Sequence, residues 1–231
     1  MKLDRDGLPF IAIAALPSAF ALARGRRRLA LGLAPLPAAI AAFFRDPDRG
    51  PDRGMAADED TVVSPADGQV MYVGPADPAA APHGDWQQIV IFLSVTDVHI
   101  NRAPYAGTVA SVTYRPGRFL AAFTPESGTE NERSEITVVR DLAGGGQRTV
   151  VFRQIVGMLA RRVVTRVQPG DVVATGERIG LMKFGSRMDV FLPDEAAISV
   201  VETDRVVAGE TVLARWPALD GSGATPTASA P

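Results

Sequence analysis

From Asp60 onward the chain is a succession of short runs rich in β-branched residues, each ended by glycine, proline or aspartate. Runs such as QQIVIFLSV, GTVASVTY and SEITVVR have the length of strands, and no long amphipathic helical pattern competes with them. Turn pairs separate the runs, namely Asp67-Gly68, Pro116-Gly117 and Pro169-Gly170. This pattern predicts a mainly β fold, built as a β-sandwich or a barrel-like sheet.

Two apolar runs without any charged residue precede the β-rich part, LPFIAIAALPSAFALA at residues 8–23 and LALGLAPLPAAIAAFF at residues 29–44. Each would be about 24 Å long as a helix, against about 30 Å of bilayer hydrocarbon. We therefore expect residues 1–45 to form an apolar helical hairpin that associates with a membrane. Two short spans, a hairpin within one leaflet and a buried helical pair in a soluble protein are the three alternatives.

The arginines between the runs, in RGRRR, favour the hairpin within one leaflet. If the folded part is cytoplasmic, two full spans would place these arginines outside, against the positive-inside tendency. A shallow hairpin would keep them near anionic headgroups. The expected location is thus the cell membrane, on its cytoplasmic face. Residues 46–219 are expected to form the β domain, and residues 220–231, DGSGATPTASAP, a disordered tail.

Composition removes several kinds of chemistry. Cysteine is absent, which excludes disulfides, thiolate nucleophiles and cysteine-ligated zinc. There are only two histidines, His83 and His99, so no metal site is predicted and any imidazole base is one of these two. The net charge of −2 gives no support to a nucleic-acid partner.

Three places in the β-rich part carry residues with possible chemistry. In GLMKFGSRMDVFLP, the Ser186 hydroxyl could attack the preceding carbonyl, and Gly185 permits the unusual backbone angles that such an attack needs. His99, in SVTDVHINRAP, could act as the base, with Asp67 of SPADGQV as the carboxylate that fixes its tautomer. Asp97 is close to His99 in sequence. Gly-Ser and Asp-Gly are also common turn pairs, and histidines at strand ends often satisfy backbone groups, so the structural alternatives stay open.

Together these stretches resemble the phosphatidylserine decarboxylase family, in its short bacterial and archaeal form. The resemblance covers most of the chain in consistent order, through AAFFRDPDR, VVSPADGQV, IFLSVTDVHINRAPYAGTV, FLAAFTPESGTENERSEI, QIVGMLARRVV and PGDVVATGERIGLMKFGSRMDVFLP. It implies a β-rich hybrid catalytic domain. It also implies a carboxy-lyase of phospholipid biosynthesis that is made as a zymogen.

The resemblance further implies autocatalytic cleavage between Gly185 and Ser186. The products would be a β chain of residues 1–185 and an α chain of residues 186–231, held together as a heterodimer. Ser186 would become a covalent pyruvoyl cofactor, which forms a Schiff base with the amine of phosphatidylserine and acts as an electron sink. Loss of CO₂ would leave phosphatidylethanolamine. The lipid substrate and the membrane surface are the expected partners.

Site roles implied by the resemblance fall on Ser186, His99 and Asp67, with Asp97 as a possible support. Asn131, Glu132 and Arg133, in the long polar segment 115–133, are expected near the lipid headgroup. Two positions depart from many relatives: Arg102 stands near the place of a second histidine, and Arg187 follows the serine.

Two other functions are weighed against this interpretation. GLMKFGS and VVETDRVVAG are similar to the hairpins of biotinyl and lipoyl carrier domains, whose modified lysine sits at a hairpin tip. Lys183 is the only lysine nearby, and Arg205 stands where a lipoyl lysine would be needed. The second alternative is a non-catalytic membrane adaptor of the same fold.

Overall fold

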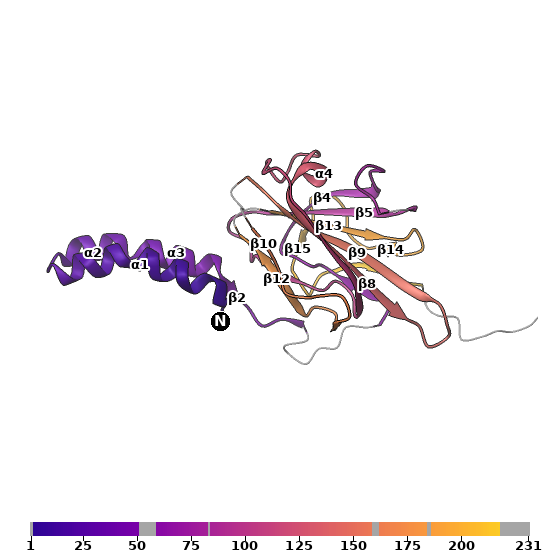
Figure 1. Ribbon diagram of the computed structural model, residues 1–231, viewed down its shortest axis with the longest axis horizontal. Coiled ribbons are helices and arrows are strands. Elements are labelled where there is room, and N and C mark those ends of the chain that lie inside the picture. The colour runs from indigo at the N-terminus through magenta and orange to yellow at the C-terminus, as the bar shows by residue number, and fades with distance from the viewer. Residues whose placement is uncertain (1, 51–58, 83, 159–161, 184–185, 218–231) are drawn as a thin grey trace, which may run out of the picture.

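The computed structural model describes residues 2–50, 59–82, 84–158, 162–183 and 186–217. It consists of a helical hairpin that projects from a mainly β domain (Figure 1). This confirms the predicted fold class, mainly β with an N-terminal apolar hairpin. His83, Gly185 and the predicted tail 220–231 lie outside the described residues.

One large antiparallel sheet dominates the β domain (Figure 1). Its eight strands lie in the order β11 (Val172–Val173), β7 (Gly107–Arg115), β8 (Arg133–Asp141), β9 (Gln147–Val156), β13 (Ser186–Leu192), β5 (Gln87–Leu93), β4 (Gly68–Pro75) and β15 (Arg205–Val206). The order places β13 between β9 and β5, in the interior of the sheet.

Two smaller antiparallel sheets share a core with the large one. Their strands are β10 (Val163–Thr165), β12 (Arg178–Met182) and β6 (Ile100–Arg102) in one, and β14 (Ala197–Ile198), β16 (Val212–Arg215) and β3 (Thr61–Val63) in the other. Buried apolar residues of all three sheets form one cluster, which includes Ile91, Phe152, Met182, Val190 and Leu213.

Alternation along β13 decides which side chains enter this core. Met188, Val190 and Leu192 point into it, whereas Arg187 and Asp189 point to the other face of the sheet. The strand begins at Ser186 itself, so this serine lies in a strand and not in a turn. Its side chain has the parity of Met188 and therefore faces the core.

Both apolar runs are helical. The first begins with a 3-10 turn, η1 (Arg5–Gly7), and continues as α1 (Leu8–Ala23). The second is divided into α2 (Arg27–Leu33) and α3 (Pro35–Phe43), because Pro35 starts a new helix more easily than it continues one. Figure 1 shows α2 and α3 returning alongside α1.

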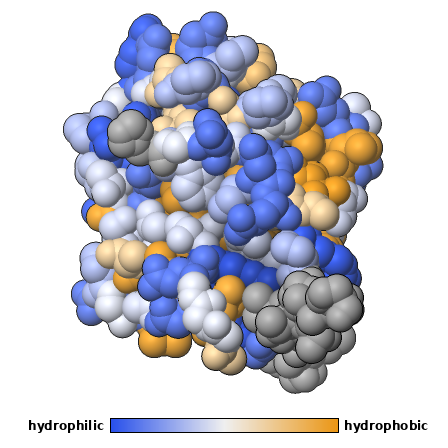
Figure 2. Space-filling model, turned by 90° about the vertical axis from the view of Figure 1, so that its right-hand side faces the viewer, coloured by the Kyte–Doolittle hydropathy of each residue, from blue (hydrophilic) through white to orange (hydrophobic). Residues whose placement is uncertain are grey.

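The hairpin presents apolar side chains outward. Ile13, Leu16, Phe20 and Leu31 are each more than 60% exposed, so the two runs are not a buried helical pair. Among the described residues one helix, Arg5–Ala23, is long and apolar enough to cross a membrane. By contrast, the face of the β domain turned away from the hairpin is mostly hydrophilic or neutral, with smaller apolar patches (Figure 2).

Ion pairs fasten the base of the hairpin to the β domain. A short ladder joins β1 (Lys2–Leu3) to β2 (Arg45–Asp46). Arg166 donates to both carboxylate oxygens of Asp4 at 2.7 Å and to Asp6 at 2.6 Å. The contacts of Arg166 hold the base of the hairpin beside the β10–β12–β6 sheet.

Candidate active site

Ser186 lies at the first position of β13, paired with Leu93 of β5 and Val156 of β9. Its side chain is fully buried, and its Oγ has no hydrogen-bond partner within the described part of the chain. Burying a hydroxyl without a partner costs about 1–3 kcal/mol. A cost of this kind at a serine marks the position as a candidate for chemistry.

His99 lies between β5 and β6, in the segment that runs past the end of β12. Its backbone oxygen accepts from the Met182 N–H at 3.2 Å, and Met182 is the last residue before the connection to Ser186. The ring Nδ1 lies 2.9 Å from the backbone oxygen of Asp97. Because a carbonyl only accepts, Nδ1 carries the hydrogen and Nε2 carries the lone pair.

Burial keeps the His99 ring neutral. The side chain is 1% exposed, and its ring lies 4.3 Å from the Phe43 ring at the end of α3, measured between centroids. Desolvation lowers the pKa of His99 to about 4, and the nearby Asp97 groups oppose this only in part. At neutral pH the imidazole is therefore in the form that accepts a proton.

Asp67 and Asp97 are both held by arginines. The Asp67 carboxylate pairs with the Arg49 guanidinium and accepts from the Ala208 N–H at 2.9 Å. The Asp97 carboxylate pairs with Arg205 and caps the turn at Ser94, accepting from its N–H and its hydroxyl at 2.8 Å each. The tautomer of His99 is thus set by the Asp97 backbone rather than by either carboxylate, while the charges of Asp97 and Asp67 both favour the protonated ring.

The family model for phosphatidylserine decarboxylase matches residues 36–214. The chain belongs to the phosphatidylserine decarboxylase family.

Several relatives named "Phosphatidylserine decarboxylase proenzyme" support this membership. The protein from Solibacter usitatus is 49% identical over 173 residues, 75% of this chain and 76% of its own length. The one from Erythrobacter litoralis is 46% identical over 81% of this chain and 77% of its own. The one from Novosphingobium aromaticivorans is 42% identical over 96% of this chain and 91% of its own. Membership makes the chain a decarboxylase, so the carrier and adaptor interpretations are not retained.

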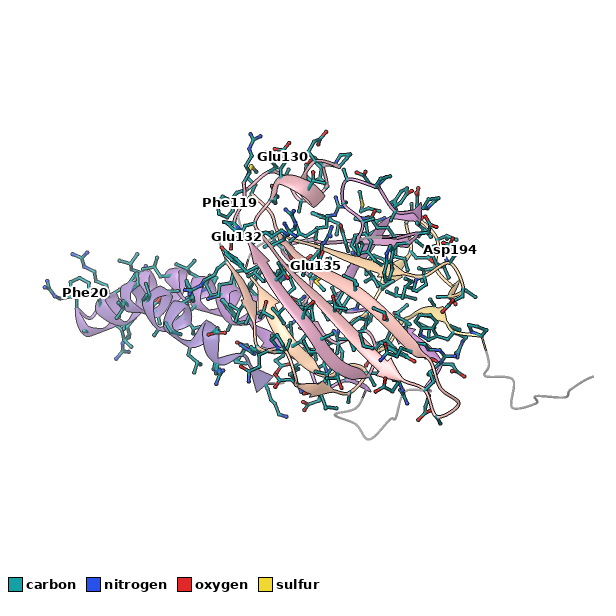
Figure 3. All side chains as sticks on the ribbon, turned by 45° about the vertical axis from the view of Figure 1, so that its right-hand side comes forward. Phe20, Phe119, Glu130, Glu132, Glu135 and Asp194 are labelled. Carbon is teal, nitrogen blue, oxygen red and sulfur yellow. The ribbon has the colours of Figure 1, made fainter. Side chains whose placement is uncertain are left out.

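The long segment after β7 covers the face of β13 opposite to the Ser186 side chain. It contains α4 (Ser127–Glu130), and Figure 3 shows Phe119 and Glu130 projecting from it. Asn131 is fully buried and anchors the segment: its amide donates to Leu120 O at 2.9 Å and Val156 O at 2.8 Å and accepts from Leu120 N–H at 2.9 Å. Asn131 is therefore part of the scaffold beside Ser186, through Val156.

Glu132 lies at the start of β8 (Figure 3), beside the Tyr114 hydroxyl. Partial desolvation first, and the Glu132 carboxylate second, raise the pKa of that hydroxyl. Of the three residues expected near the lipid headgroup, Glu132 and Arg133 have partly exposed side chains and Asn131 is buried.

Arg187 and Asp189 form a buried pair on the covered face of β13. Arg187 Nε and Nη2 donate to the two carboxylate oxygens of Asp189 at 2.6 and 3.0 Å. A cavity of about 540 Å³ lies next to Arg187 and is lined mainly by apolar side chains, among them Met71, Tyr72 and Phe123. Neither Ser186 nor His99 lines it, so it is separate from the candidate active site.

Arg102, near the place of a second histidine in many phosphatidylserine decarboxylases, has a structural position here. It is buried and donates to Gly176 O at 2.7 Å and Pro47 O at 2.9 Å, with the Asp46 carboxylate at 3.9 Å. Sequence reasoning missed two residues of this region: Arg49, which pairs with Asp67, and Phe43, which covers His99. Both lie in the AAFFRDPDR stretch, and that motif was the available signal.

Proposed function

We propose that this chain is the precursor of a pyruvoyl-dependent phosphatidylserine decarboxylase, which forms phosphatidylethanolamine and CO₂ after it has cut itself before Ser186. The family match across residues 36–214, which includes Ser186, carries the proposal. The Ser186 hydroxyl is buried and has no hydrogen-bond partner among the described residues, which supports the proposal.

Self-cleavage begins when Ser186 Oγ attacks the carbonyl carbon of the peptide bond before it. His99 Nε2 takes the hydroxyl proton and passes it to the Ser186 nitrogen as the amide becomes an ester. Asp67 and Asp97 favour the charged imidazole that forms in between. These two carboxylates therefore act by charge, from positions fixed by Arg49 and Arg205.

Cleavage follows by elimination. A base removes the Cα proton of Ser186, the Cβ–O bond breaks, and the preceding residue leaves as a carboxylate. The dehydroalanine that remains takes up water and releases ammonia, so that a keto group caps the new chain. Leu93 and Val156 flank this position in the sheet. Within the described ranges the Ser186 hydroxyl has no hydrogen-bond acceptor, and a keto oxygen, which only accepts hydrogen bonds, needs none.

The bound keto group would supply the electron sink that stabilises charge when the lipid carboxylate leaves as CO₂. His99 would serve this stage as the proton carrier at Nε2. Because burial favours its neutral form, a protonated His99 gives up its proton readily.

The two fragments are expected to stay together. Residues 186–231 would contribute β13, which is hydrogen-bonded on one edge to β5 and on the other to β9. They also contribute β15 and β16, which pair with β4 and β3 of the larger fragment. Four ladders of backbone hydrogen bonds would thus hold the heterodimer.

A lipid substrate agrees with the exposed hairpin. We propose that residues 1–45 attach the enzyme to the cytoplasmic face of the cell membrane and that residues 46–219 carry the chemistry. The α3 end of the hairpin reaches the site directly, since Phe43 packs on His99. Lys183, the lysine that a carrier would modify, lies over the Phe10 ring of α1, with Nζ 5.0 Å from the centroid.

Replacing Ser186 tests the proposal. Ser186→Ala removes the attacking oxygen, so we expect one full-length chain and no release of CO₂ from phosphatidylserine vesicles. The wild type should give two chains, the smaller one reacting with phenylhydrazine and lacking a free N-terminal amine, as intact-mass measurement would show. Ser199→Ala, at an exposed serine in the same fragment, is the matched control and should behave as wild type. Normal cleavage of Ser186→Ala would end the proposal.

A further inference from the structure

Strand register defines one end of the large sheet. Ser186, the first residue of β13, pairs with the last residue of β5 and with the last residue of β9. The first residue of β8 pairs with the last but one residue of β9 and with the last residue of β7. Because paired residues lie about 5 Å apart across an antiparallel sheet, these strand ends form one row, the Ser186 end of the sheet. The chain leaves this end through segments 94–99 and 116–132 and, after β9, from Gly157 onward.

Large apolar side chains are exposed at the Ser186 end. Val95, Phe119 and Met158 belong to the three segments that leave it, and Tyr114 is the last but one residue of β7. All four side chains are more than 40% exposed. Figure 3 shows Phe119 on the side of the β domain from which the hairpin projects. Apolar groups that gather at one end of a folded domain indicate a contact with an apolar phase or partner.

The hairpin leaves the β domain at this same end. Arg45, two residues after α3, donates to Thr96 O at 2.6 Å, in the segment that also contains Val95. Phe43, the last residue of α3, packs on His99, which ends that segment. Figure 1 shows the hairpin projecting away from this side of the β domain. A hairpin held by a bilayer therefore keeps the Ser186 end close to the membrane surface.

Charge contributes little at the Ser186 end. The exposed or half-buried charged residues described in segments 115–132 and 157–162 are Arg115, Arg118, Arg162, Glu126, Glu130 and Glu132. The two signs are equal in number, and Arg118 pairs with Glu130 at 2.7 Å. Anionic headgroups thus neither attract nor repel these segments strongly, and the apolar side chains decide what the end contacts.

We propose that Val95, Tyr114, Phe119 and Met158 form a second membrane contact, which places the Ser186 end in the headgroup layer of the bilayer. This inference rests on the proposed function. A bilayer is the occupant that the structure favours, because the exposed apolar hairpin adjoins the same end. With this contact, the headgroup of phosphatidylserine can reach Ser186 while its acyl chains stay in the bilayer. A tyrosine at the rim suits this layer, since its ring is apolar and its hydroxyl is polar.

A dye at position 119 tests the contact without any need for catalysis. Cysteine is absent from the chain, so Phe119→Cys supplies a single site for the environment-sensitive dye NBD. On vesicles of phosphatidylcholine and phosphatidylserine, we expect its emission to shift to the blue and to be quenched by lipids that carry a nitroxide near the headgroup. An aqueous spectrum at position 119 on vesicles that have bound the protein would overturn the proposal. A blue shift without vesicles that grows with protein concentration would also overturn it, in favour of a second copy of the chain.

Val172→Cys is the matched control for the dye. Val172 is an exposed apolar residue of the same sheet, and it pairs with Thr108, at the opposite end of β7 from the Ser186 end. The NBD group at position 172 should keep its aqueous spectrum on the same vesicles. Equal blue shifts and equal quenching at positions 119 and 172 would overturn the proposal, because the contact would then not be confined to the Ser186 end.

Phe119→Ser combined with Met158→Ser tests the consequence for activity. Loss of two apolar side chains should weaken vesicle binding about tenfold and lower CO₂ release from vesicles by a similar factor at limiting lipid. Release from short-chain phosphatidylserine below its critical micelle concentration should stay at the wild-type rate. Unchanged release from vesicles, or an equal loss on both substrates, would overturn the proposal. A wild type that releases no CO₂ from either substrate would instead refute the proposed function, while the dye would still report the contact.

Discussion

At the scale of single residues, the environment of His99 decides its chemistry. The side chain is buried against Phe43, and the Asp97 backbone oxygen fixes its tautomer. Because the ring pKa is lowered to about 4, we expect maturation to depend on pH with a midpoint near 4 instead of 6.5. Rates of cleavage of fresh precursor between pH 3.5 and 8 measure this. A midpoint near 6.5 would mean that His99 is solvated in the reacting state.

The same shift affects stability. Between pH 6.5 and 4 the unfolded chain binds a proton at His99 that the folded chain does not, so stability is present above pH 6.5 and is lost as pH falls toward 4. The loss is roughly 3 kcal/mol at most. Urea unfolding of wild type and His99→Gln at pH 7.5 and 4.5 should show it as a pH-dependent difference. An unchanged difference between the two chains would contradict the lowered pKa.

At the scale of elements, the segment 115–133 is held as a cover over the large sheet. Its length and polarity indicated a functional loop, and Asn131 was expected near the headgroup. The structure places that side chain inside the fold, with hydrogen bonds to Leu120 and Val156. A sequence pattern cannot distinguish these two roles, because an asparagine that anchors a loop and one that binds a ligand use the same amide.

Asn131→Leu distinguishes the two roles. The variant leaves backbone groups of Leu120 and Val156 without their side-chain partner, which we expect to cost about 2 kcal/mol or more and to lower the Tm by roughly 4–8 °C. Thermal unfolding followed by circular dichroism gives the value. Glu132→Gln, a neighbouring change at a partly exposed side chain, should leave the Tm within about 1 °C of wild type. Wild-type stability of Asn131→Leu would contradict the anchoring role of Asn131.

At the scale of the whole molecule, an apolar hairpin is fixed to a folded β domain. Figure 1 shows the turn between α1 and α2 at the end of the hairpin far from the β domain. This turn and its flanks contain Arg24, Arg26, Arg27 and Arg28. Each arginine near an anionic surface contributes about 1 kcal/mol. Replacing all four with glutamine should therefore weaken binding to vesicles that contain anionic lipid at least tenfold, with little change on neutral vesicles.

Co-sedimentation with the two kinds of vesicle measures this binding. Arg115→Gln, at an exposed arginine of the β domain, is the matched control. Leu16→Asp combined with Phe20→Asp should weaken binding to both vesicle types, because these two side chains are exposed apolar groups of α1. Equal binding of all variants would show that the hairpin is not the membrane contact.

Local sequence patterns were sufficient to predict much of this protein's fold. Short β-branched runs and turn pairs predicted a mainly β fold, and the charge-free runs predicted the hairpin, because strand and helix periodicities depend on near neighbours. Motif order indicated the family. Contacts between residues far apart in sequence required the tertiary structure: the Arg49 pair with Asp67 and the Phe43 cover on His99. Burial and hydrogen-bond partners are properties of the packed layers, so only the fold determined that the Ser186 hydroxyl is buried with no partner among the described residues.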